Sequence, residues 1–540
     1  MRRDNVQKVC CRQLFCIHRW ETVCGPEDDK EEKDMRTELR RTSPEKQGVS
    51  SRKVLKLLQD IDRTENELHG FMLAVNDSVI AEGWRKPFSA DIPHCCHSLG
   101  KSYTCTAVGI ACTEGLLDPD DRVVDLFADD IRKFGIHVKP GFEKLKLRHL
   151  MSMSTGMPSM PMMDDAWERN FLSSGIQYEP GTHFLYNSTG SCMLGAAVEK
   201  VTGKSLLGYL QDKLFDKIGI RPEDIVWQKF INGRYAEPGL CATTEANLRL
   251  GLFYLHDGCA EGEQVISKQW MHDATSLQIE TSDTHKKEDD GTWGYGWQLW
   301  HGSVKGLYRF DGGQGQLCYV FPQKHCVFAV HQAGRDPENL RQFAQLVDAF
   351  LSELPDEPSE LPDAPKDQEA LRQYIDQLSV SDVPESAGTL DAVDWDGEYE
   401  VESGEVQPWI EVVPVDVNFW RHFYDPAVNA EVKKVSIRTA KDEVDICFNG
   451  RSMIHVRLDH QFIIFDTPNV LPGLEKTCAL GWVGKDGRLH VDLHWINGWF
   501  RAEMDLENTG DGRITVDISK DMLHEYSDLV KYHGVLRRIG

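Results

Sequence analysis

The spacing of hydrophobic positions predicts a mixed α/β arrangement over the first part of the chain. In the stretch 50–63, apolar residues recur three and four positions apart, as on one face of an amphipathic helix. The stretch 70–84 alternates apolar and polar residues around Asn76-Asp77, a pair that favours a tight turn, so we expect a β-hairpin there. From Ser98 the pattern is helical again as far as Gly115, which stands where a helix C-cap is expected.

Further along, the pattern returns to strands and closes with a helix. The stretches 294–300 and 317–333 are rich in apolar and aromatic residues, and Pro322 to His325 divide the second stretch into two strands. An amphipathic helix is expected over 337–354. With strands early, helices in the middle and strands late, the pattern indicates a sheet whose edges come from distant ends of the chain.

A proline-rich, acidic segment separates this part from a β-rich one. Four prolines fall between positions 355 and 365, as in a stiff, solvated linker. After a helix expected over 367–378, short alternating stretches that begin at 409–417 predict an antiparallel sandwich or barrel, followed by a helix over 519–533. We therefore expect a disordered extension, a first domain, a linker and a C-terminal β-rich domain over 1–34, 35–354, 355–365 and 366–540.

The balance of charge limits the partners of the chain. The 540 residues carry 60 lysines and arginines against 86 aspartates and glutamates, a formal net charge of -26. Such a field repels phosphate backbones, so we expect no nucleic-acid partner. No apolar run approaches the ~20 residues that span a bilayer, and the first residues lack a secretory signal pattern. The 15 cysteines lack regular spacing, which favours reduced thiols, so we expect a cytoplasmic protein with no membrane partner.

Three chemistries compete within residues 94–109, HCCHSLGKSYTCTAVG. A phosphate-binding loop needs a glycine five residues before Gly100, where Cys95 stands. Four consecutive residues, His94 to His97, do not all point at one metal ion, because neighbours on an extended chain face opposite ways. We expect them to lead the chain into a helix as a strand or turn, with no metal bound. A metal site in which His94 and His97 join distant ligands is the alternative. The cysteines before residue 35 leave a zinc knuckle as the alternative to a non-structural extension.

A serine nucleophile with a lysine base fits the same stretch. On the first turn of a helix, Ser98 and Lys101 lie on one face and within hydrogen-bond reach of each other. The helix N-terminus offers backbone amides to an oxyanion. The apolar residues that follow bury the helix, which favours a neutral lysine able to accept the serine proton.

Three later segments give this pair its context: LKLRHLMSMSTGMPSM at 145–160, a block at 179–220 that contains YNS, and YRFDGGQGQLCYVFPQKHCVFAV at 308–330. Together with the serine and lysine, they resemble the serine β-lactamase-like superfamily, which includes class C β-lactamases, D-alanyl-D-alanine peptidases and related esterases and amide hydrolases. The resemblance covers about 42–354. It implies an α/β (α+β) fold, in which an antiparallel sheet is flanked by helices and accompanied by an all-helical subdomain.

The resemblance also implies roles for individual residues. Ser98 looks like the acylated nucleophile and Lys101 like its base, while the phenol of Tyr186 looks like the group that relays the proton to the leaving group. The backbone amides of Ser98 and Gly313 would bind the oxyanion. The resemblance implies no metal or organic cofactor.

Two motifs depart from the family pattern. The asparagine of the second motif stands one place early, so Asn187 and Ser188 are exchanged, and either is compatible with hydrogen bonding to substrate. Phe310-Asp311-Gly312 stands where β-lactamases carry Lys-Thr-Gly or His-Thr-Gly, without a cation. The group that grips the carboxylate of a β-lactam or peptide is then missing. Asp311 either favours a neutral or cationic substrate or merely caps the turn into Gly312.

These features predict a serine hydrolase acting on a small ester or amide as its small-molecule partner. A β-lactamase or D-amino-acid peptidase is one alternative, and a non-catalytic member of the superfamily that binds a ligand or partner is another.

Several large side chains fit either a site or a packing role. A run of methionines between positions 151 and 163 would adapt to apolar substrates or fill gaps. Aromatic residues before the third motif would wall the pocket or pack the strand, namely Trp293, Tyr295 and Trp297. In the C-terminal domain we expect core packing rather than a ligand cavity for Trp495, Trp499 and Phe500.

Overall fold

The first part of the chain is built on one mixed sheet. A computed structural model describes residues 38–230, 232–281, 292–357, 359–379, 386–390, 394–409, 431–467, 473–521 and 530–539. The extension expected over 1–34 lies outside these residues. Among the described residues, the strand order is β1 (Arg40–Arg41), β3 (Ser78–Trp84), β2 (Glu67–Val75), β14 (Cys326–Ala333), β13 (Gln316–Phe321), β12 (Tyr308–Gly312), β11 (Trp300–Gly302), β10 (Thr292–Tyr295) and β9 (Ile279–Glu280).

This order joins segments from distant parts of the sequence, as the hydrophobic pattern predicts. The hairpin of β2 and β3 pairs through β2 with β14, antiparallel and over the whole length of both strands. Its turn residues Asn76 and Asp77 have φ values of 47° and 59°, the left-handed conformation that a two-residue hairpin turn requires. The two sheet edges are β1 and β9.

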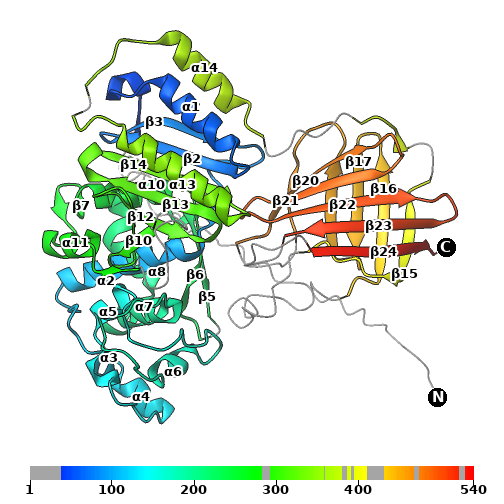
Figure 1. The fold of residues 1–540 in the computed structure, drawn as a ribbon. Coiled ribbons are helices and arrows are strands. Elements are labelled where there is room, and N and C mark those ends of the chain that lie inside the picture. The colour runs from blue at the N-terminus through cyan, green and yellow to red at the C-terminus, as the bar shows by residue number, and fades with distance from the viewer. Residues whose placement is uncertain are drawn as a thin grey trace, which may run out of the picture. The chain divides into compact units, whose positions relative to one another are not determined.

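Helices cover both faces of the sheet (Figure 1). One face buries apolar side chains against α1 (Ser51–Asp62) and α13 (Pro337–Ser352), and α14 (Pro365–Asp376) packs beside α1 with Leu371 in the same core. The other face packs against α10 (Thr244–Leu255), α2 (Gly100–Thr113) and the helices that lie beyond them, including α5 (Leu147–Met151) and α7 (Ser188–Thr202). The helices predicted over 50–63, 98–115, 337–354 and 367–378 are therefore present.

The strand expected over 294–300 is a hairpin instead. The chain leaves β10 at Tyr295 and enters β11 at Trp300, and Gln298 between them has a φ of 57°. The side-chain amide of Gln298 donates hydrogen bonds to the carbonyl oxygens of Leu150 and Met151, at 3.0 and 2.9 Å. These tertiary contacts hold a turn that the apolar pattern of the stretch does not indicate.

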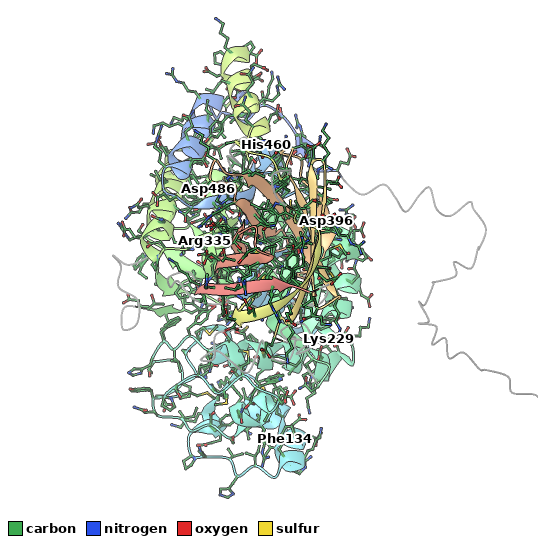
Figure 2. The ribbon with its side chains drawn as sticks, turned by 90° about the vertical axis from the view of Figure 1, so that its right-hand side faces the viewer. Phe134, Lys229, Arg335, Asp396, His460 and Asp486 are labelled. Atoms are coloured by element: carbon green, nitrogen blue, oxygen red, sulfur yellow. The ribbon has the colours of Figure 1, made fainter. Side chains whose placement is uncertain are left out.

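The C-terminal part is a closed barrel, so of the two expected architectures the barrel is the one found. Strands that are neighbours in the wall pair antiparallel, except that a parallel pairing between β18 (Ser452–Arg457) and β20 (Lys476–Val483) closes the ring. Figure 2 labels three of its residues: Asp396 directly precedes the first described strand of the barrel, and His460 and Asp486 lie in segments that connect strands. The described strands are β15 (Gly397–Gly404), β16 (Lys434–Ala440), β17 (Glu443–Phe448), β18 (Ser452–Arg457), β19 (Ile464–Asp466), β20 (Lys476–Val483), β21 (Leu489–Trp495), β22 (Arg501–Asn508), β23 (Arg513–Lys520) and β24 (Val530–Arg538).

The prediction of a helix over 519–533 is wrong at both ends of that stretch. Its first residues belong to β23 and its last residues to β24, and these two strands are antiparallel neighbours in the barrel wall. The residues from 522 to 529 lie outside the described part, as does most of the strand expected over 409–417. Exposure along β24 largely alternates between successive residues, a strand period that a helical interpretation of this stretch overlooks.

Candidate active site

Ser98 sits in a tight turn between a short strand and a buried helix. His94–Cys95 form β4, which pairs with β6 (Tyr235–Ala242), and His97–Leu99 form a turn of 3-10 helix that continues into α2. The expectation that these residues lead the chain into the helix is confirmed. His97, directly before the serine, has a φ of 47°, a strained conformation for a residue other than glycine.

Lys101 reaches back along the helix to the serine. Its Nζ atom lies 2.8 Å from Ser98 Oγ, and only 1% of the lysine is exposed. The same Nζ atom lies 4.8 Å from the centre of the Tyr186 ring. The structure thus brings together three of the side chains to which the resemblance gives catalytic roles.

An aromatic cluster holds the Tyr186 ring. The ring stacks on Trp300 with a centroid distance of 5.7 Å and an interplanar angle of 20°, and Tyr295 meets it edge-on at 6.4 Å. Of the aromatic residues singled out in the sequence, Tyr295 belongs to this cluster, whereas Trp297 packs against Trp270 in the adjoining core. The sequence analysis gives no role to Trp300. Its position at the end of an aromatic stretch is the one feature of the sequence that indicates a place in this cluster.

Asn187 and Ser188 start the helix that follows the tyrosine. Asn187 is fully buried, and its Oδ1 atom accepts a hydrogen bond from the amide of Gly190, so it is the N-cap of α7. Its own amide donates to Met153 Sδ, and its Nδ2 atom donates to Met157 Sδ. Ser188 occupies the first turn of the helix and is half-buried. In this arrangement the Asn187 side chain anchors the segment that carries Tyr186.

The end of β12 lies against the turn that carries Ser98. A Cβ atom added to Gly312 would stand 2.0 Å from the carbonyl oxygen of Cys96, so the two backbones meet at a distance that only glycine allows. Gly313 is the next residue, and a Cβ atom there would lie 3.7 Å from the His97 ring. Gly312 and Gly313 therefore stand beside the turn that carries Ser98, where the order of the motifs predicts them.

Asp311 shares a face of β12 with an arginine. Arg309 Nε donates to Asp311 Oδ2 at 2.7 Å, while Phe310 between them points to the opposite face and packs on the Tyr254 ring at 5.0 Å. A cavity of about 280 Å³ adjoins this strand end. It is lined by Arg309, Asp311, Gly313, Leu317, Leu340 and Ala344, among others. Phe310 is fully buried and supplies no cation at the third motif.

Gln298, which the sequence did not single out, links the helices that carry these groups. Its Oε1 atom accepts from Ser191 Oγ of α7 at 2.7 Å, and its backbone carbonyl accepts from Ser102 Oγ of α2 at 2.9 Å. Its side-chain amide holds the carboxyl end of α5. A buried glutamine in a hairpin turn has no sequence signature, because its partners come from three separate segments.

Three buried histidines form a chain next to the turn that carries Ser98. His69 Nδ1 lies 2.9 Å from His94 Nε2, the His94 ring stacks on His331 at 4.6 Å, and Asn247 Nδ2 donates to His331 Nε2 at 2.8 Å. Burial lowers the pKa of His69 to about 4 and that of His331 to about 3, and it holds the pKa of His94 well below the ordinary value. These rings are therefore neutral at neutral pH.

The remaining residues that the sequence analysis names are either buried in the core or exposed on the surface. Over the described part of the chain, no three His, Cys, Asp or Glu side chains gather closely enough to hold a metal ion, and the cysteines there are free thiols. Met160 and Met162 are 46% and 58% exposed, whereas the rest of that methionine run is buried. The barrel residues Trp495, Trp499 and Phe500 are buried in the core, as expected.

Comparison with known proteins accords with this arrangement. The Beta-lactamase family model matches residues 61–351. The chain belongs to the β-lactamase family. Membership, together with the relatives below, indicates a hydrolase of the serine β-lactamase superfamily and confirms the fold that the motifs implied. Among the described residues of this β-lactamase-family protein, none of the helices is both long and apolar enough to cross a bilayer.

Its relatives in this family are distant. The chain is 23% identical over 292 residues to the 6-aminohexanoate-dimer hydrolase of Paenarthrobacter ureafaciens, a match covering 50% of this chain and 73% of that protein. It is 26% identical over 306 residues to penicillin-binding protein 4 of Amycolatopsis lactamdurans, covering 48% and 79%. Among solved structures, the octameric penicillin-binding protein homologue from Pyrococcus abyssi aligns with 89% of this chain and 99% of its own, with 17% identity and a TM-score of 0.43.

Proposed function

We propose that this chain is a serine hydrolase that forms an acyl-enzyme on Ser98 and acts on a small ester or amide. The observation that carries the proposal is the 2.8 Å hydrogen bond between Lys101 Nζ and Ser98 Oγ, at a lysine shielded from water. A shielded amine next to a hydroxyl is a base for that hydroxyl. Membership of the β-lactamase family supports the assignment.

The reaction divides into two proton-coupled steps. Lys101 accepts the proton of Ser98 as the Oγ atom attacks the substrate carbonyl, and the negative charge on the carbonyl oxygen is held by the backbone amides of Ser98 and Gly313. The proton passes by way of Tyr186 to the leaving alcohol or amine, and the carbonyl–leaving-group bond breaks. Water then attacks the acyl-enzyme and gives up a proton to the same lysine. The bond between the acyl carbon and Ser98 Oγ breaks, the lysine returns the proton to Oγ, and the acid is released.

The residues of the third motif favour a substrate that has no carboxylate to be bound by a cation. Phe310 stands where a cation would hold that carboxylate, and the Asp311 carboxylate is already paired with Arg309. The similarity to a hydrolase named for 6-aminohexanoate dimers supports amides as one class to test.

β-Lactamase or peptidase activity is the second candidate, favoured by the similarity to a penicillin-binding protein. Nitrocefin, p-nitrophenyl esters and D-amino-acid amides separate the two. Ester turnover well above nitrocefin turnover supports the esterase or amidase assignment, and equal turnover supports the second candidate.

The nucleophile is tested with a fluorophosphonate probe on the full chain at pH 7–8. The proposal predicts labelling of the wild-type protein and none of Ser98→Ala, with both proteins folded by circular dichroism. An unlabelled wild type, or equal labelling of the variant, would contradict it.

A further inference from the structure

A turn of the barrel is hydrogen-bonded to the segment that leads into Ser98. The turn joins β21 to β22 and contains Asn497 and Trp499. Asn497 accepts from the amide of Cys95 through its carbonyl oxygen, at 2.6 Å, and donates from Nδ2 to the carbonyl of Pro93, at 2.9 Å. Its Oδ1 atom accepts from the amide of Lys476, at 2.8 Å, so the asparagine is itself fixed within the barrel.

The third bond reaches the residue next to the nucleophile. Trp499 Nε1 lies 2.7 Å from His97 Nε2, and both side chains are buried. An indole N–H group donates only, so the Nε2 atom of His97 is the acceptor and the ring carries its proton on Nδ1. The bond therefore fixes both the position and the tautomer of the His97 ring.

The backbone of His97 needs such support. A φ of 47° is uncommon for a residue other than glycine, so surrounding contacts must hold it. Two contacts flank this backbone: Gly312 and Gly313 lie against Cys96 and the His97 ring, and the Trp499 indole bonds the same ring. The orientation of the Ser98 side chain follows from this backbone, because Ser98 is the next residue in the same 3-10 turn.

The turn that carries Trp499 has a further anchor on the first sheet. Arg335, which is labelled in Figure 2, lies between β14 and α13 and donates from Nη2 to the carbonyl oxygen of Trp499, at 3.1 Å. Its Nε atom lies 3.2 Å from Asp521, whose carboxylate also accepts from the amide of Arg501. The backbone on both sides of the indole is thus restrained, so the Trp499 N–H is held toward His97.

We propose that Trp499 of the C-terminal barrel is a positioning residue for the nucleophile, acting through His97. The inference rests on the proposed function, because it assigns Trp499 to the orientation of a reactive Ser98. The barrel is then part of the catalytic apparatus rather than a separate ligand-binding module.

Trp499→Phe removes the indole N–H and keeps an aromatic ring in the core, and Trp495→Phe is its matched control. Trp495 is buried in the same strand–turn segment, and its Nε1 atom has no hydrogen-bond partner among the described residues. Fluorophosphonate labelling of full-length protein, followed over a range of probe concentrations, separates the chemical rate constant from probe affinity. We expect Trp499→Phe to lower the rate constant about 10- to 100-fold with little change in affinity, and Trp495→Phe to label at the wild-type rate.

Thermal unfolding of each variant is measured beside the labelling kinetics. A second variant removes the acceptor of the hydrogen bond instead of its donor. His97→Asn loses the ring but tolerates the left-handed backbone, so it should slow labelling as Trp499→Phe does, and the double variant should be no slower than the slower single one. The inference is overturned if Trp499→Phe labels at the rate of Trp495→Phe, or if the two effects simply multiply. A wild type that does not label at Ser98 would instead contradict the proposed function.

Discussion

Gly312 and Cys96 approach so closely that a Cβ atom on the glycine would lie 2.0 Å from the cysteine carbonyl oxygen. This contact sets the distance between the end of β12 and the turn that carries Ser98. Because Gly313 follows directly, the same contact sets where its amide stands relative to the serine.

Gly312→Ala should therefore damage the site more than the fold. The added methyl group has to push β12 away from the nucleophile turn, at a cost of about 1–3 kcal/mol in the free energy of unfolding. We expect fluorophosphonate labelling to slow about 10- to 100-fold. Gly175→Ala is the control, since a Cβ there meets only Lys139, at 3.5 Å. Equal labelling rates for the two variants would show that the contact is not needed.

Lys101→Met tests the base. Methionine fills a similar buried volume without an amine, so the helix should remain folded while the Ser98 hydroxyl loses its proton acceptor. The rate constant for labelling and for ester hydrolysis should fall about 10²- to 10⁴-fold. Lys133→Met, on the exposed surface of α4 (Ala128–Phe134), should leave both rates unchanged. A fully active Lys101→Met protein would assign the base to another group.

Gln298→Leu tests the link between the helices. The substitution leaves Ser191 Oγ without its acceptor and removes the side-chain hydrogen bonds to the carbonyl oxygens of Leu150 and Met151, which should lower the free energy of unfolding by about 2–4 kcal/mol. Gln269→Leu removes only an exposed hydrogen bond, to Asp273, and should change it by less than about 0.5 kcal/mol. Urea unfolding followed by tryptophan fluorescence measures both, and similar values for the two variants would refute the link.

The histidine chain predicts how stability depends on pH. Burial lowers the pKa of His69 to about 4 and of His331 to about 3, against about 6.5 in an unfolded chain. Between these values the unfolded state binds more protons, so the free energy of unfolding falls as the pH drops below about 6.5. Each histidine should contribute a loss of about 2 kcal/mol between pH 7 and pH 5. In His331→Gln, urea unfolding should show a smaller difference between the two pH values, and an unchanged difference would contradict the assignment.

Many elements of this fold can be predicted from local patterns in the sequence. The helix at 51–62, the hairpin around Asn76 and the alternating strands of the barrel follow from periods of 3.6 and 2 and from turn residues. The pairing of Ser98 with Lys101 follows from helical spacing alone, and the motif order identified the family.

The remainder depends on contacts between distant segments. The turn at Gln298 exists because its amide binds α5 and α7, and the apolar stretch around it reads as a continuous strand. Asn187 caps a helix, a role that the motif comparison did not separate from substrate binding. The hydrogen bond from Trp499 to His97 joins residues that are 402 positions apart in the sequence, so no local pattern predicts it.

The most direct test of the central claim is to find the acyl group itself. The full-length protein is mixed with p-nitrophenyl acetate, quenched with acid during turnover, digested and mapped by mass spectrometry. We expect a burst of p-nitrophenol and one acetyl group on the peptide that contains Ser98, and neither of these in Ser98→Ala. Turnover by the wild type without that acetyl group, or undiminished turnover by Ser98→Ala, would contradict the central claim.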